Sequence, residues 1–145
     1  MKIVLDANIL VSAYLRGGVP LLITDRVGES LDTSFFTCDT IKEVEDVISR
    51  SKFGLSQEQI DCILADIRYN GKQVAVLPQQ RVSGVCRDPK DDKILECAVV
   101  AGVDYIVSGD SDLHDMKEYK GIKIVTASEY LQIVNYTKIF EQSTD

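Results

Sequence analysis

The chain has few of the residues on which common catalytic and metal sites depend. Its 145 residues include no tryptophan, three prolines, four cysteines and one histidine, His114. A single histidine excludes two-histidine ribonucleases and zinc sites of the HExxH type, and any Ser-His-Asp site would have to use His114, which we expect in a surface turn. The cysteines form no CxxC pair, which argues against a zinc ribbon or a thioredoxin-like redox motif.

Long apolar runs and excess positive charge are also missing. No run approaches the roughly 18 residues of a membrane span, and Asp6 interrupts the apolar start, so we expect neither a signal peptide nor membrane association. We therefore expect a cytoplasmic protein whose cysteines are free thiols. Sixteen basic and 23 acidic residues give a net charge of −7. That balance argues against a broadly basic nucleic-acid surface, but it allows an acidic site that reaches nucleic acid through metal ions.

Short apolar runs alternate with helical patterns along the chain. The runs predict strands at 2–5, 34–38, 73–77, 105–108 and 122–125. Helices are predicted at 8–15, 20–28, 40–53, 56–70, 91–101, 112–116 and 127–134 from apolar periodicity, capping boxes and terminal glycines. This alternation predicts one α/β domain over residues 1–134, with a mostly parallel sheet of about five strands, helices on both faces, and a frayed tail at 135–145.

Acidic residues lie where the predicted strands end. Asp6 follows the first strand directly, Glu43 lies about one helical turn after the second, and Asp110 follows the fourth. Asp91 and Asp92 begin the helix that follows the third strand and its loop. Since ligand sites in open α/β sheets form beyond the carboxyl ends of the strands, these acids are expected to share one site.

Each acid also has a simple structural explanation. Asp6 and Asp110 suit turns or helix caps, Glu43 has the spacing of a capping box with Thr40, and Asp91 or Asp92 suits a helix N-terminus. Together, however, like charges at one edge repel one another unless a cation lies between them. Carboxylates select hard ions such as Mg²⁺ or Mn²⁺. Such ions can activate water for attack on a phosphodiester without a histidine base.

Three segments resemble PIN-domain ribonucleases, and in particular the VapC-like toxins of type II toxin–antitoxin systems. They are KIVLDANILVSAYL, SFFTCDTIKEVEDVISRSKF and RDPKDDKILECAVVAGVDYIVSGDSDL, and the likeness covers about residues 1–131. The resemblance implies a metal-dependent endoribonuclease, an antitoxin partner and a homodimer. It also implies that Asp6, Glu43, Asp91 and Asp110 hold Mg²⁺ or Mn²⁺ and carry catalysis, with Ser108 where the family has Ser or Thr.

The third acid and the activity each leave an alternative open. Asp91 shares a helix face with Ile94, Leu95 and Ala98, so it is expected in the cleft, while Asp92 is expected to face solvent or a local cap.

Two other functions compete with the nuclease. One is a catalytically silent PIN-like module that binds RNA or a partner. The other is a haloacid-dehalogenase-like phosphatase, whose pattern would need aspartates where this chain has Asn8 and His114.

Overall fold

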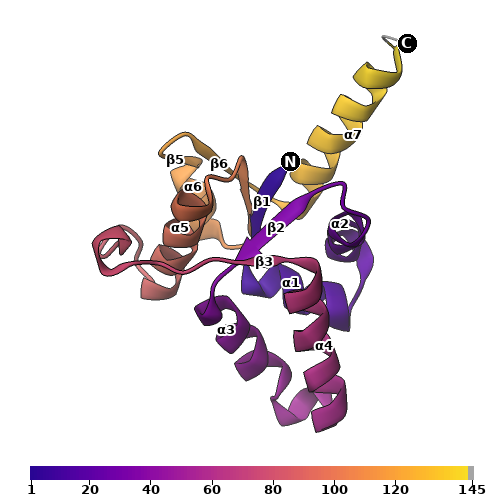
Figure 1. Cartoon of the computed structure of the whole chain (residues 1–145), viewed down its shortest axis with the longest axis vertical. Coiled ribbons are helices and arrows are strands. Elements are labelled where there is room, and N and C mark those ends of the chain that lie inside the picture. The colour runs from indigo at the N-terminus through magenta and orange to yellow at the C-terminus, as the bar shows by residue number, and fades with distance from the viewer. Residues whose placement is uncertain (144–145) are drawn as a thin grey trace.

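The structure, a computed structural model, describes residues 1–143, and it describes side chains through residue 135. A six-stranded sheet with the order β3-β2-β1-β4-β6-β5 forms its centre (Figure 1). The strands are β1 (Lys2–Leu5), β2 (Thr33–Phe36), β3 (Lys72–Gln73), β4 (Tyr105–Val107), β5 (Glu118–Tyr119) and β6 (Ile122–Val125). All neighbours pair in parallel except β5, which is antiparallel to β6. The predicted mostly parallel sheet is therefore confirmed, with β5 as a sixth strand that the sequence did not predict.

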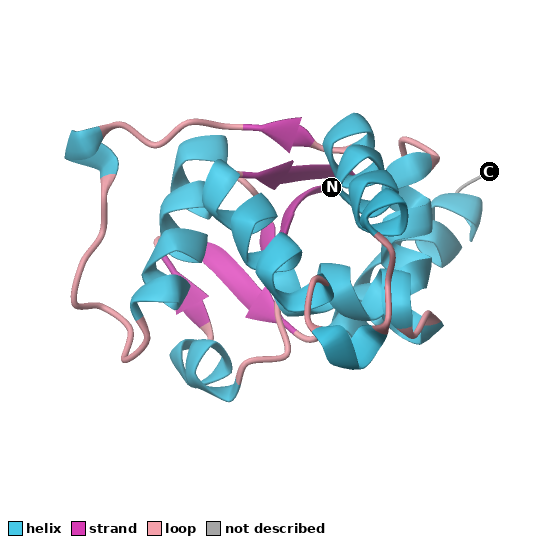
Figure 2. Cartoon of the chain, turned by 90° about the horizontal axis from the view of Figure 1, so that it is seen from below, coloured by secondary structure: helices cyan, strands magenta, loops and turns pink. Residues whose placement is uncertain are grey.

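Helices connect the strands and cover both faces of the sheet. The α-helices are α1 (Ala7–Leu15), α2 (Gly18–Gly28), α3 (Cys38–Ile48), α4 (Gln57–Asn70), α5 (Pro89–Ala101), α6 (Ser111–Met116) and α7 (Ala127–Ser143). Two short 3₁₀ helices span Ser51–Phe53 and Pro78–Gln80. The segment between β3 and α5 carries the second of them and runs wide of the other elements as an open loop (Figures 1 and 2).

Alternation of side chains along β1 divides the core into two layers. Ile3 and Leu5 face one layer, in which α1, α3, α4 and α7 pack against the sheet. Val4 faces the other layer, where it packs with residues of α5 and with Leu113 of α6. Because both faces of this strand are buried, it has the continuous apolar sequence expected of a central parallel strand.

Local capping explains where α3 and α4 begin. The predicted box of Ser56 and Gln59 is confirmed at the start of α4. The predicted box of Thr40 and Glu43 is wrong, because the α3 box is formed by Thr37 and Thr40. The helix begins at Cys38, two residues earlier than expected, so β2 ends at Phe36.

The third strand is much shorter than the predicted 73–77. The Val74 N–H still donates to the Phe36 carbonyl (2.8 Å), but β2 ends there and offers no further partner. Before β3, Gly71 passes so close to the Phe36 ring that an added Cβ would lie 2.8 Å from it. Any larger residue here would require the Phe36 ring or the backbone to shift, so glycine suits the return of α4 to the sheet.

Two helix boundaries also differ from expectation. The fifth helix starts at Pro89 instead of Asp91, because Asp88 is its N-cap and accepts a hydrogen bond from the Lys90 N–H (3.0 Å). The last helix continues to Ser143, so the expected end near 134 and the frayed tail are wrong for the described part of residues 135–145. No glycine or proline interrupts the sequence between 127 and 143. The division into a domain of 1–134 and a tail of 135–145 stays a prediction.

Within residues 1–143, no single helix is long and apolar enough to cross a membrane. By length and composition alone, α1 and α2 pass as a pair that is bent at the break between them.

Candidate active site

The ends of β1 and β4 meet at one edge of the sheet, and an acid follows each. Asp6 comes directly after β1, and its backbone N–H donates to the Val107 carbonyl at the end of β4 (3.0 Å). The buried Ser108 hydroxyl donates to Asp6 Oδ2 (2.7 Å) and accepts from the Asp110 backbone N–H (3.0 Å). One hydroxyl group therefore links Asp6 to Asp110.

Asp6 occupies the N-cap position of α1. Its side chain makes no capping hydrogen bond of normal geometry, although the backbone N–H groups of Asn8 and Ala7 lower the pKa of its carboxyl. Burial raises the pKa of this carboxyl, the hydrogen bond from Ser108 opposes that effect, and the charge of Asp110 adds to it. The net direction is upward, as expected of a carboxylate held near another carboxylate in a buried place.

The carboxylate of Asp110 combines a local role with a position in the site. Its Oδ1 accepts a hydrogen bond from the Asp112 N–H (2.8 Å), so Asp110 caps the short helix α6. This is the turn role that the sequence allowed. Its negative charge also contributes to the raised pKa of Asp6 and of Asp91.

Asp91 is the least satisfied acid of the site. The residue is 5% exposed, and among the described residues its Oδ2 atom is buried without a hydrogen-bond partner. Burial, followed by the charges of Asp110 and Asp6, raises the pKa of Asp91 to about 6. Leaving a buried acceptor without a donor costs free energy, so this oxygen is a candidate for binding something else.

Asp92 is equally buried but has a different partner. Its Oδ1 accepts a hydrogen bond from the Cys86 N–H (2.8 Å). The expectation that Asp92 faces solvent or caps a helix locally is wrong, because it holds the loop before α5 instead. One turn later, Glu96 does the same and accepts from the Val82 N–H (2.7 Å).

Glu43 reaches the same site from α3. Its side chain is half-buried, and burial raises its pKa, followed by the negative charge of Asp6. The positive charges of Lys90 and Lys93 act in the opposite direction. Glu43 therefore lies between the other acids and a group of cations on α5.

The four predicted acids thus share one end of the sheet, with Asp6 as their common neighbour. The charge of Asp6 acts on Glu43 and Asp91, and Asp110 acts on both Asp6 and Asp91. Their side chains do not, however, form a ready-made metal site. Within the described part of the chain, no three His, Cys, Asp or Glu side chains form a group that could hold a metal ion.

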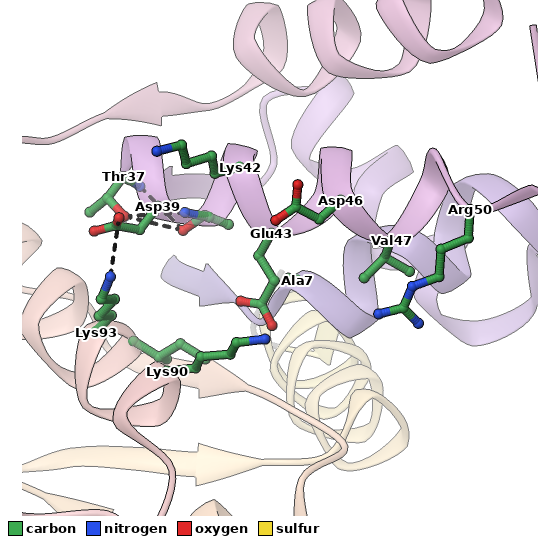
Figure 3. A pocket seen from close by; sticks show the side chains of 12 residues that line it. Ala7, Thr37, Asp39, Lys42, Glu43, Asp46, Val47, Arg50, Lys90 and Lys93 are labelled. Atoms are coloured by element: carbon green, nitrogen blue, oxygen red, sulfur yellow. Dashed lines mark hydrogen bonds and ion pairs between the residues drawn. The ribbon is translucent and has the colours of Figure 1, made fainter. Parts of the chain in front are cut away.

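A pocket of about 190 Å³ opens beside Glu43, between α3 and α5. Ala7, next to Asp6 in the chain, forms part of its wall, and Ile94 of α5 forms another. In Figure 3 the Glu43 and Lys90 side chains both point into the space between the two helices. The pocket therefore adjoins the acids.

A family model described as the PIN domain matches residues 2–112, which include all four of these acids. This chain belongs to the PIN-domain family. The resemblance seen in the sequence is therefore confirmed, and we refer to the chain below as this PIN domain.

The fold has a counterpart among solved structures. One chain of the crystal structure of VapBC2 from Rickettsia felis, bound to a DNA fragment from their promoter, superposes on this PIN domain with a TM-score of 0.61. The match covers 86% of this chain and 97% of the other at 14% sequence identity, so it shows the fold alone. Comparison with curated protein sequences finds no match.

The donor set of this PIN domain suits a hard divalent cation. All four acids offer carboxylate oxygens, which Mg²⁺ and Mn²⁺ prefer. The unpartnered Asp91 Oδ2 is the atom that such an ion would satisfy first. The charges of the buried Asp6 and the half-buried Asp110 would be compensated by the same ion.

Sequence reasoning overlooked several side chains around the site. It did not identify Asp88 as the helix cap, although an Asp-Pro pair before a helical pattern is a usual start signal. His114, expected in a surface turn, is half-buried, and its Nε2 lies at hydrogen-bonding distance from the Ser108 carbonyl oxygen. The loop-holding roles of Asp92 and Glu96 had no local signal, because their partners come from a segment without regular structure.

Proposed function

We propose that this PIN domain is a metal-dependent endoribonuclease that hydrolyses RNA phosphodiester bonds, with Asp6, Glu43, Asp91 and Asp110 as its catalytic, metal-holding residues. The observation that carries this proposal is the buried, unpartnered carboxylate oxygen of Asp91 beside two further buried or half-buried aspartates. PIN domains generally use divalent metal ions, and this acid set has the chemistry to hold Mg²⁺ or Mn²⁺.

The protein side chains orient the carboxylates. Ser108 donates its hydroxyl hydrogen to one oxygen of Asp6 and so holds that carboxylate in place. Asp110 is held on both sides, by the Ser108 hydroxyl at its backbone and by the Asp112 N–H at its carboxylate. When bound, divalent ions supply the activation of water and the stabilisation of the leaving oxygen that phosphodiester hydrolysis requires.

We also propose that the protein is the toxin of a type II toxin–antitoxin system. The fold shared with a chain of the VapBC2 complex supports an antitoxin partner. Assembly as a homodimer and a cytoplasmic location belong to the same proposal. All four cysteines are free thiols, which suits a reducing compartment.

A circular single-stranded RNA tests the activity directly. We expect the protein to convert the circle to linear fragments in Mn²⁺ or Mg²⁺ and to leave it intact in EDTA, because an endonuclease needs no free end. Binding of the RNA without cleavage in Mn²⁺ would instead favour a catalytically silent module. Release of phosphate from a phosphomonoester, with the RNA intact, would favour a phosphatase.

A further inference from the structure

The pocket between α3 and α5 gathers positive charge in a protein whose net charge is −7. Four cations line it, Lys42, Arg50, Lys90 and Lys93, alongside three acids, Asp39, Glu43 and Asp46. The pocket is thus the place beside the acid cluster where a negatively charged ligand meets cations.

Pairing within the pocket decides which cations are available. Lys93 is engaged with Asp39 (3.3 Å). Among the described residues, Lys90 and Arg50 make no ion pair, and in Figure 3 Lys90 extends from α5, and Arg50 from the turn after α3, into the pocket. Asp46 points away from α5 in the same view, so its carboxylate competes little with a ligand for Lys90 and Arg50.

The size and walls of the pocket limit what it can hold. About 190 Å³ is less than the roughly 300–1,000 Å³ of typical small-molecule sites, so the pocket suits one residue of a polymer better than a whole cofactor. Its walls include the apolar side chains Ala7, Val47 and Ile94 beside the cations. An occupant with a charged part and an apolar face matches this lining, and a nucleotide has both.

We propose that this pocket binds the nucleotide adjoining the scissile phosphate of a single-stranded RNA, with Lys90 and Arg50 contacting its phosphate. The inference rests on the proposed nuclease function and deepens it. The pocket shares Glu43 with the acid cluster, and its wall at Ala7 is one residue from Asp6, so its occupant lies next to the reacting bond. Turning one residue of a base-paired strand into a pocket costs its pairing and stacking, so the pocket favours unpaired segments.

Binding measured in Ca²⁺ tests the pocket separately from turnover. The probe is a fluorescently labelled single-stranded RNA, titrated with the parent protein and with the double variant Lys90→Gln/Arg50→Gln. We expect about a tenfold loss of affinity. The slope of log K against log salt should fall by roughly 1.4, because each lost contact with a single strand removes about 0.7.

A matched control separates contact from overall charge. Lys72→Gln/Lys123→Gln also removes two positive charges, from exposed lysines on β3 and β6, and it should leave the slope unchanged. Equal affinity of the parent and the Lys90/Arg50 variant, equal loss in the control, or equally tight binding of the same RNA as a duplex would overturn the proposal.

A second measurement applies even where the double variant fails to fold. A single neutral methylphosphonate linkage is moved along the RNA, and one position should weaken binding to the parent by about tenfold while its neighbours do not. Uniform weakening at every position would overturn the pocket. Position-specific binding without cleavage in Mn²⁺ would refute the proposed nuclease function but support the nucleotide pocket. Cleavage without position-specific binding would support the nuclease function and refute the pocket.

Discussion

The buried carboxylates on the two sides of α5 differ in their hydrogen-bond partners. On one side, Asp92 and Glu96 accept hydrogen bonds from the backbone N–H groups of Cys86 and Val82. On the other side, Asp91 is as buried as Asp92, but its Oδ2 has no partner among the described residues.

This difference separates the two acids of α5 that hold a loop from the acid that we propose holds a metal ion. A buried carboxylate that accepts a backbone N–H satisfies two polar groups at once, and removing it leaves an unpaired N–H. A buried carboxylate near like charges costs stability instead, and the pKa of Asp91 rises to about 6 as a result. Burial alone does not distinguish these roles, but the hydrogen-bond partners do.

The largest expected effect is on catalysis. Asp91→Asn keeps the size of the side chain and removes its charge, so RNA cleavage in Mn²⁺ should fall by ~10²-fold or more, as should cleavage by Asp6→Asn. Asp92→Asn should lose much less, because its partner is the loop. Initial rates on one RNA measure all three variants, and the opposite ranking of positions 91 and 92 would move the site to Asp92.

Glu43 has a matched control on its own helix. Glu43→Gln should reduce cleavage strongly, whereas Glu45→Gln, at an exposed position two residues away, should not. Equal losses in both variants would show that charge on α3, rather than the place of Glu43 in the site, matters.

Metal binding should stabilise the folded state and so raise the melting temperature. An ion that binds only the folded state adds about 2.7 kcal/mol at ~100 times its Kd, which corresponds to a shift of roughly 5–11 °C for a domain of this size. Mn²⁺ should exceed Mg²⁺ at equal concentration. The shift should be absent in Asp6→Asn/Asp110→Asn, and a parent protein that ignores millimolar Mn²⁺ would contradict the metal site.

Loss of a loop-holding acid should affect folding more than metal binding. Asp92→Ala leaves the Cys86 N–H without its acceptor, so the free energy of unfolding should fall by about 1–3 kcal/mol. Urea titration measures this change, with Asp91→Ala for comparison. We expect Asp91→Ala to destabilise less and the melting shift in Mn²⁺ to survive in Asp92→Ala. Reversal of either ranking would remove the distinction between the two sides of α5.

The raised pKa of Asp91 predicts how stability changes with pH. The pKa of its carboxyl is near 3.8 in the unfolded chain and about 6 in the folded state. Its contribution to folding stability is therefore complete below pH 3.8 and is lost as pH rises through about 6. The parent should therefore lose a few degrees of melting temperature across this window without metal. Asp91→Asn should show a smaller loss, and a parent that gains no more from Mn²⁺ at pH 7 than at pH 5 would contradict the assignment.

The smallest effect is expected at the edge of the pocket. Lys93 and Asp39 form an exposed ion pair (3.3 Å), and such pairs stabilise proteins by about 0–1 kcal/mol. Lys93→Gln should therefore change the free energy of unfolding by less than ~1 kcal/mol in urea titration. A larger loss would indicate that the pair fixes α5 against α3.

Much of the fold was predictable because its signals are local. The strand sequence at the start of the chain, the capping box of Ser56 and Gln59 and the C-terminal glycine of α5 each depend on neighbouring residues. The errors at the starts of α3 and α5 concern local capping residues, Thr37 and Asp88, whereas the error in the third strand depends on a distant partner. The third strand ends early because β2 stops at Phe36, and that stop depends on Thr37 capping α3.

The candidate site divides in the same way. Sequence alone predicted acids after the strands, because parallel strands bring their carboxyl ends to one edge whatever the loops do, but it left the third acid open between Asp91 and Asp92. Only the tertiary structure decided between neighbours. Asp91 and Asp92 have nearly the same local sequence. They differ because the 81–88 loop offers an N–H to Asp92, while the charges of Asp110 and Asp6 raise the pKa of Asp91. Hydrogen bonds and charge interactions depend on distance in space, so no pattern along the chain contains them.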